Sequence, residues 1–363
     1  MDSAPRAYRL KASNACLSFS TFSGATPSAN REGITIHLYN LRADKAILNA
    51  PLKSQCARDY LYGKDLKLEE LLQQSEGSYA SFIRKLETDV TSIDEPMLCS
   101  LRGFSALQAV RTEASMLRYK AMVLGSRNSV FQEWHAKQPL MSDERMMLGS
   151  LHAFGQALKY STDLKPCLLI NKTRQGFFTS DDPTVLANRL HTQKLNSQVF
   201  GWSNSGAFVY LALTPAYGVI YYDGLVYTIR NKMGITLDVS KASDVDALNE
   251  LVALNCSQKL YFAEGDEDNA RQRLGAIWGH RCERSRLRVF ISVRKEGNRE
   301  ELRIATEEEK KGKGPFVIQT ISVFPAPRLW PSFLRYRDPL RMFSNGSAIG
   351  YVRKQEWLRK EAA

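Results

Sequence analysis

The chain has 363 residues, of which 44% are hydrophobic and 24% charged, and its formal net charge is +12. This is the composition of an ordinary folded protein and argues against wholesale disorder. No apolar run approaches the roughly 18 to 20 residues that a membrane helix needs. Residues 1–6 have no apolar core of the signal-peptide type. The sequence therefore predicts a cytoplasmic protein with no membrane partner.

The six cysteines are widely scattered, which favours reduced thiols in a reducing compartment. Cys256, His280 and Cys282 come nearest to a metal-binding set. Zinc sites usually combine a tighter pair of ligands with a second pair. The alternative is a buried Cys256 on a helix and a polar turn around His280.

The basic excess lies at the C-terminal end. Residues 271–363 contain 21 Lys and Arg against 10 Asp and Glu, whereas residues 1–270 are nearly balanced. A one-sided positive field attracts polyanions, because binding releases counterions from their phosphates. RNA or DNA is therefore the expected partner. The alternatives are an acidic protein partner and a solvated basic surface that keeps the protein in solution.

A strand is expected at residues 33–39. The rest of the first half of the chain shows mainly helical periodicity. Apolar residues recur at helical spacing over 68–90 and, as one continuous stripe, over 101–124. A third helix is expected to begin near Ser142. These stripes predict a helical layer over about residues 65–160.

The second half reads mainly as strands. The apolar run 207–213 suits a strand buried on both faces. Asp223-Gly224, between two further apolar runs, predicts a hairpin turn with Gly224 at positive φ. Ser243 and Asp246 resemble a capping box at the start of a helix. Further strands are expected at 167–170, 177–179, 286–294, 302–305 and 316–323.

These elements predict an α+β fold, with a helical layer (about 65–160) packed on a mainly antiparallel sheet (about 165–325). The chain is expected to divide into an N-terminal strand and loop segment, a helical region, a sheet region and a basic aromatic tail. The boundaries are 1–60, 61–162, 163–325 and 326–363.

The order of local signals resembles a bacterial family known as domain of unknown function four-two-three-eight. Residues 168–173 (Leu-Leu-Ile-Asn-Lys-Thr) and 177–183 (Phe-Phe-Thr-Ser-Asp-Asp-Pro) are similar to its Phe-Ile-Thr-Ser-Asp-x-Pro core. Residues 60–65 (Tyr-Leu-Tyr-Gly-Lys-Asp) and 104–112 (Phe-Ser-Ala-Leu-Gln-Ala-Val-Arg-Thr) agree in order, as do 213–215 and 248–262. The likeness spans about residues 55–270.

One departure from the family pattern lies at the N-terminus. Family members typically open with His-His-Tyr-(Val/Ile)-Pro-x-Phe-Tyr-Leu, whereas residues 4–10 read Ala-Pro-Arg-Ala-Tyr-Arg-Leu. If the two histidines act chemically in the family, this chain has lost that chemistry. The resemblance implies no assigned activity, and it suggests phage defence or mobile-element biology as the setting.

Asp181 and Asp182 follow a short strand and precede a proline, where catalytic or metal-binding carboxylates often lie. Two such carboxylates can hold Mg²⁺ if other acids complete the site. Asp223 and the acidic cluster 264–268 are the available partners. The alternative is structural, with Ser180 or Asp181 capping the turn before Pro183.

Arg111 lies near the apolar stripe of the second predicted helix. A buried arginine needs a carboxylate partner, and Asp181 or Asp182 could supply it. Arg111, Ser180 and Asp181 would then form a structural anchor between the helical layer and the sheet.

The tail interleaves cations with aromatic residues, a composition that suits contacts with phosphates and stacking on bases. The alternative is that the aromatic residues pack the tail onto the sheet region while the arginines face water. The nucleic-acid-binding residues that this pattern predicts are Arg328, Trp330, Arg335, Tyr336, Arg337, Arg341, Arg353 and Lys354.

Three functions remain open at this point. The leading hypothesis is nucleic-acid binding through the basic C-terminal region, in which case deletion of residues 326–363 should cost most of the affinity. The second is a metal-dependent nuclease centred on Asp181 and Asp182, with Mg²⁺ as its cofactor. The third is a non-enzymatic protein-interaction module whose basic face meets an acidic partner.

Overall fold

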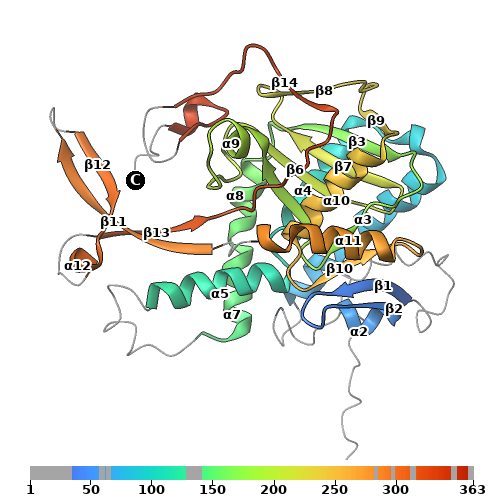
Figure 1. The fold of residues 1–363 in the computed structure, drawn as a ribbon, viewed down its shortest axis with the longest axis horizontal. Helices are drawn as coiled ribbons and strands as arrows, with labels where there is room; N and C mark the ends of the chain where they lie inside the picture. Colours follow the sequence, from blue (N-terminus) through green and yellow to red (C-terminus); the bar gives the residue numbers. More distant parts are fainter. Residues whose placement is uncertain are drawn as a thin grey trace, which may run out of the picture.

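The structure, a computed structural model, describes residues 35–56, 62, 67–127, 141–281, 285–295, 299–310, 316–344 and 350–358. Residues 4–10 and Cys282, considered above, lie outside this set. The predicted α+β class is confirmed (Figure 1). No helix in the described part of the chain is long and apolar enough to cross a membrane.

The helices of the first half pack against one another. These helices are α3 (Lys67–Thr88), α4 (Glu95–Gln108), α5 (Glu113–Arg127), α7 (Asp143–Leu151) and α8 (Ala153–Lys159), with a 3-10 turn at Val90–Ser92. α4 begins after Asp94 and α7 begins after Ser142, because the side chains of both residues accept hydrogen bonds from first-turn N–H groups. The start near Ser142 agrees with the sequence prediction.

The central element is a five-stranded sheet of order β5-β6-β7-β3-β9. It is antiparallel throughout except for the pairing of β3 with β9. Every residue of β6 is buried, as its unbroken apolar run predicts. The strands are β3 (Lys165–Asn171), β5 (Thr184–Asn188), β6 (Ala207–Ala212), β7 (Tyr217–Tyr222) and β9 (Thr236–Val239).

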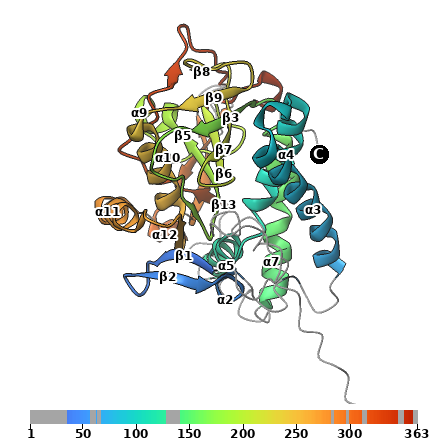
Figure 2. The same ribbon diagram turned by 90° about the vertical axis from the view of Figure 1, so that its right-hand side faces the viewer.

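Helices cover both faces of this sheet. In Figure 2, α3 and α4 lie on one side of the strands and α10 (Ala242–Asn255) on the other. One hydrophobic core lies between the sheet and α3 and α4, and a larger one lies on the α10 side. The Thr179–Asp182 segment, described below, sits between these layers.

A second sheet joins the N-terminal segment to the sheet region. Its order is β2-β1-β10-β4, and every pairing in it is antiparallel. Its strands are β1 (Thr35–Asn40), β2 (Lys45–Pro51), β4 (Thr179–Ser180) and β10 (Lys259–Phe262). Two short helices, α2 (Leu52–Cys56) and α9 (Arg189–Gln193), follow β2 and β5, and α11 (Glu267–Ile277) follows β10, with a 3-10 turn at Trp278–His280.

The C-terminal quarter contributes an arm and a return segment. A three-stranded antiparallel sheet of order β12-β11-β13 extends from the body in Figure 1. Its elements are β11 (Ser285–Lys295), β12 (Arg299–Ile304), the short helix α12 (Glu307–Lys310) and β13 (Phe316–Ser322). The chain then returns to the body, where β14 (Leu334–Tyr336) pairs with β8 (Tyr227–Ile229), and it ends in a 3-10 turn at Gln355–Leu358.

The predicted continuous stripe over 101–124 is wrong in one respect, because two helices share it. α4 ends at Gln108 and α5 begins at Glu113. The hydroxyl of Thr112 accepts the N–H of Ser115 at 3.0 Å, so Thr112 caps the second helix. Apolar spacing alone does not reveal such a break, because residues on both sides of it pack against the same layer.

The start of α10 also differs from the prediction. The helix begins at Ala242, with Lys241 at the cap, and Ser243 does not cap it. Asp246, the other half of the expected capping box, instead accepts hydrogen bonds from Gln175 at 3.2 Å and Arg273 at 2.6 Å.

The Asp223-Gly224 hairpin predicted from the sequence is wrong. β8 pairs with β14, and Gly224 is not among the glycines with positive φ. The buried Asp223 carboxylate accepts the N–H groups of Gly206 at 2.7 Å and Leu225 at 2.8 Å, and it turns the chain away from β7. The physical reason is that β6 and β3 already occupy both edges of β7, which leaves no edge for β8.

Candidate functional site

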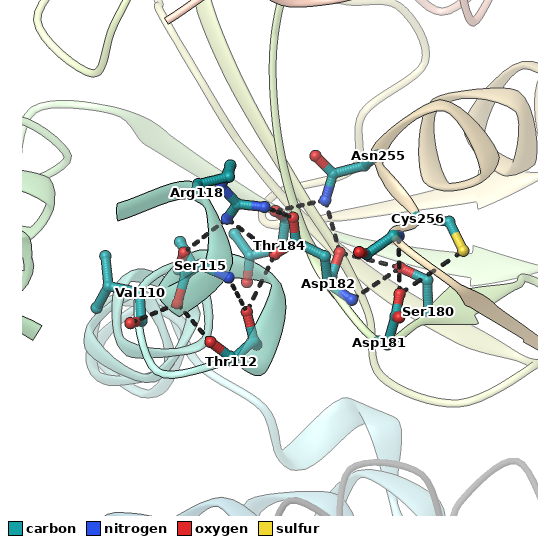
Figure 3. A network of polar contacts seen from close by, with 12 residues as sticks. Val110, Thr112, Ser115, Arg118, Ser180, Asp181, Asp182, Thr184, Asn255 and Cys256 are labelled. Carbon is teal, nitrogen blue, oxygen red and sulfur yellow. Dashed lines mark hydrogen bonds and ion pairs between the residues drawn. The ribbon is translucent and has the colours of Figure 1, made fainter. Parts of the chain in front are cut away.

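The Thr-Ser-Asp-Asp-Pro segment lies where the helical layer, α10 and both sheets meet (Figure 3). β4 ends at Ser180 and β5 begins at Thr184, so Asp181 and Asp182 lie in the short connection between the sheets. The buried Ser180 hydroxyl donates to the carbonyl oxygen of Asp182 at 3.0 Å and accepts its N–H at 3.2 Å. The Ser180 side chain therefore closes the turn before Pro183.

Asp182 is buried and forms an ion pair with Arg118 of α5. The two Nη atoms of Arg118 contact the two carboxylate oxygens, one of them at 3.3 Å. Thr112 donates to the same carboxylate at 3.5 Å. The Asp182 side chain thus joins the sheet connection to the start of α5, and Arg118 is a partner that the sequence reasoning missed.

Asp181 faces the other way, toward the start of β10. Its two oxygens accept the backbone N–H groups of Ser257, Gln258 and Lys259 at 2.8, 2.8 and 3.2 Å. Burial raises the pKa of this carboxyl group to about 6, although the three N–H groups act in the opposite direction. A pKa near 6 would suit proton transfer, but the oxygens are engaged by backbone donors.

Asn255, at the last turn of α10, fixes the backbone of the same segment. Its side-chain amide donates to the carbonyl oxygens of Asp182 at 2.6 Å and Thr184 at 3.2 Å. The Thr184 hydroxyl in turn donates to the carbonyl of Ser105 in α4 at 2.9 Å. In the sequence, this role is marked only by an asparagine near the end of a predicted helix. Asparagines occur at that position in many proteins for other reasons, so the signal is not specific.

The predicted pairing of Arg111 with Asp181 or Asp182 is wrong. Arg111 is buried, as expected, but its carboxylate partner is Glu76 of α3, and its Nε donates to Gln108 at 3.0 Å. Arg111 lies in the short connection before α5, and Arg118, two turns further on, reaches Asp182 instead. The anchor between helical layer and sheet exists, but a different arginine forms it.

Two of the carboxylates expected to complete a Mg²⁺ site, Asp223 and Asp266, are also engaged. Asp223 accepts the two backbone N–H groups described above, and Asp266 accepts the N–H of Gly176 at 2.9 Å. Cys256 is buried, and its thiol contacts Asp181 at 3.7 Å. Within the described residues, no group of three or more His, Cys, Asp and Glu side chains could hold a metal ion.

We expect Asp181→Asn to lower the free energy of unfolding by about 1 to 3 kcal/mol. An amide presents one oxygen, so in either orientation its NH₂ group would face at least one of the backbone N–H groups that Asp181 now accepts. Urea unfolding would measure the change. Asp246→Asn is the matched control, because that carboxylate contacts only side-chain donors. Equal stability of the Asp181 variant and the wild type would contradict this capping role.

Arg353 lies in the interior and is not available to phosphates. Its guanidinium pairs with Asp163, with Nε to Oδ2 at 2.9 Å and Nη2 to Oδ1 at 3.1 Å. The remaining N–H groups donate to the carbonyl oxygens of Tyr160, Trp202 and Asn204. All five donors of the side chain are therefore used.

Two other predicted cations have carboxylate partners. Arg328 pairs with the fully buried Glu250 of α10 at 3.3 Å, and the N–H groups of Arg328 and Leu329 also donate to Glu250. Lys354 pairs with Glu356 at 3.6 Å and lies over the ring of Trp357.

The predicted aromatic residues of the tail pack against the body. Trp330 contacts the larger core, and its ring meets Phe208 edge-on. The Tyr336 hydroxyl donates to the carbonyl of Arg189 at 2.9 Å. The side chains of Arg189 and Lys194 lie over the Tyr336 ring at 5.2 and 4.5 Å from its centroid. Both aromatic side chains are therefore partly buried against the body.

Arg335, Arg337 and Arg341 remain exposed, and they follow one another along the β8–β14 pair. The N–H groups of Arg337 and Arg341 donate to the carbonyls of Val226 at 2.8 Å and Leu225 at 3.3 Å, so this stretch runs beside β8. Residue Arg335 also lines a cavity of about 180 Å³ with Arg230 and Lys241. We call Arg230, Lys241, Arg335, Arg337 and Arg341 the basic face.

No curated protein and no solved structure matches this chain. One family model does match, over residues 19–266, and it is described as "Protein of unknown function (DUF4238)". The match includes the Thr179–Pro183 segment with Asp181 and Asp182, and it ends before the tail that supplies Arg335, Arg337 and Arg341. Because the match covers well over half of the chain, this protein belongs to the DUF4238 family of proteins of unknown function.

Proposed function

We propose that this protein binds nucleic acid through the basic face. The observation that carries the proposal is a set of exposed cations from segments distant in sequence. Arg335 of the tail lines one cavity with Arg230 and Lys241 of the sheet region, and Arg337 and Arg341 follow Arg335 along the tail beside β8. Among the described residues, none of the five has a carboxylate partner within ion-pair distance.

Unpaired cations favour a polyanion for a physical reason. A guanidinium group that is already paired must lose its partner before it can bind a phosphate, whereas an exposed and unpaired one loses only water and counterions. Arg335 and Arg337 are two residues apart on an extended segment, so they project on the same side. That spacing of cations suits successive phosphates of a nucleic-acid backbone.

The other two hypotheses receive no comparable support. A nuclease centred on Asp181 and Asp182 would need carboxylate oxygens that now face backbone N–H groups and Arg118. An acidic protein could bind the same cations. The binding experiment described next distinguishes an acidic protein partner from nucleic acid. The suggested setting in phage defence or mobile-element biology stays a prediction.

Point substitutions test the proposal better than the deletion of residues 326–363, because that segment supplies β14 and buried core residues. We expect Arg335→Gln, Arg337→Gln and Arg341→Gln combined to weaken binding of RNA or DNA about 10-fold or more at low salt. Electrophoretic shift assays on RNA, single-stranded DNA and duplex DNA would measure this. Wild-type affinity should fall as salt rises.

Lys85→Gln is the single-charge control, because Lys85 is an exposed cation on α3 in the helical layer. It should leave the affinity unchanged within about twofold. If the wild-type protein shifts none of the three nucleic acids at low salt, nucleic-acid binding is wrong. Binding to an acidic peptide such as poly-glutamate, without binding to nucleic acid, would favour the interaction-module alternative.

A further inference from the structure

The small cavity on the basic face has a particular composition. It holds about 180 Å³, and its cationic lining comes from three segments: Arg230 after β8, Lys241 after β9 and Arg335 in β14. Cavities that take a whole nucleoside or a drug-sized molecule occupy about 300 to 1,000 Å³. This one is therefore too small for a base and sugar but large enough for a tetrahedral oxyanion.

The acids in the cavity do not cancel its cations. Asp244 is buried, and its two oxygens accept the N–H of Ser332 at 2.5 Å and the Ser332 hydroxyl at 3.0 Å. This pairing holds the return segment against α10 and occupies the Asp244 carboxylate. Asp238 is the other acid of the lining and is exposed. Three cations against these two acids leave a net positive charge.

From this lining we infer that the cavity binds the terminal phosphate of a nucleic-acid strand. The inference rests on the nucleic-acid binding proposed above. A terminal monoester has no second sugar attached and can enter a small cavity, whereas an internal diester must lie across the mouth. The monoester also carries about −1.5 to −2 charge at pH 7, against about −1 for a diester, so the three cations favour it further.

The test compares oligonucleotides that differ only at their ends. Fluorescence anisotropy at fixed salt would measure binding of one labelled single strand with a 5′-phosphate, a 3′-phosphate or hydroxyl groups at both ends. We expect one phosphorylated form to bind about tenfold more tightly than the hydroxyl form. Which end is preferred identifies the source of the phosphate. Equal affinity for all three forms would overturn the inference and leave nucleic-acid binding intact.

Substitutions in the cavity lining test whether the cavity causes the preference for a phosphorylated strand. The double variant Arg230→Gln and Lys241→Gln should weaken binding of every form, because both side chains belong to the basic face, and it should also remove the difference in affinity between the phosphorylated and hydroxyl forms. Both side chains are exposed, so the fold should be retained. Arg341→Gln, which is outside the cavity lining, should weaken all forms equally. Asp238→Asn should increase the preference, because it removes a negative charge from the lining. A preference that survives the double variant would also overturn the inference.

A separate readout covers the case in which no oligonucleotide binds. Inorganic phosphate, added up to millimolar concentration, should raise the melting temperature of the wild-type protein and not that of the double variant. If nucleic acid fails to bind but this difference is present, the cavity is an oxyanion site and the proposed function is wrong. If phosphate also has no effect, both are wrong.

Discussion

Arg353→Met should lower the free energy of unfolding by about 3 to 5 kcal/mol. The substitution keeps much of the side-chain volume but removes all five N–H donors. It would leave the Asp163 carboxylate and the carbonyl oxygens of Tyr160, Trp202 and Asn204 without these partners. Breaking a buried ion pair by removing one partner is costly, because the remaining charge stays in a poorly solvated place.

Urea unfolding of the purified variant would measure this loss. Lys354→Met is the matched control, since it removes the neighbouring cation from an exposed site and should change stability by less than about 1 kcal/mol. Arg353→Lys should recover only part of the loss, because an ammonium group has three donors in place of five. Similar stability of the Arg353 and Lys354 methionine variants would show that Arg353 is not a structural residue.

Gly206→Ala should be destabilising by about 2 to 5 kcal/mol, from two separate causes. Gly206 has φ +78°, a conformation that residues with a Cβ rarely adopt. A Cβ there would also lie 2.7 Å from both Asn188 Oδ1 and Leu190 Cβ, and both of these residues are fully buried. The N–H of Gly206 donates to Asp223 and its carbonyl accepts from the Tyr227 hydroxyl at 3.0 Å, so the backbone cannot shift freely.

Gly224→Ala is the control for this prediction. Gly224 is not at positive φ, and the nearest atoms to an added Cβ belong to the methylene groups of Lys165, which can move aside. We expect a loss below about 1 kcal/mol. Thermal unfolding of the two variants side by side gives the comparison, and a Gly224 variant as unstable as the Gly206 variant would contradict this account of the turn.

The Arg353 prediction concerns the return of the C-terminal segment to the body. Asp163, Asp244 and Glu250 are acids of the helical and sheet regions, and each accepts hydrogen bonds from residues after 325. β14 pairs with β8, and Phe333 and Leu334 belong to the larger hydrophobic core. The described residues beyond 325 are therefore part of the folded unit, and the basic face exists only because they return to it.

Elements with local sequence signals could be predicted before the fold was known. α3 covers the predicted stripe over 68–90, because one apolar face repeats through it at helical spacing. β6 is buried along its whole length, because an unbroken apolar run has no polar face to turn toward water. The motif order around residues 177–183 likewise identified the family that the full comparison shows.

Contacts between residues far apart in the chain could not be predicted in this way. Arg111 and Glu76 are 35 positions apart, and Arg353 and Asp163 are 190 apart. An arginine gives the same sequence signal whether it is exposed like Arg335 or buried like Arg353. The difference depends on whether a distant carboxylate and free carbonyl groups surround it after folding. The pairing of β8 with β14 could not be predicted from the sequence either. Strand pairing depends on which strand edges are already occupied by other strands.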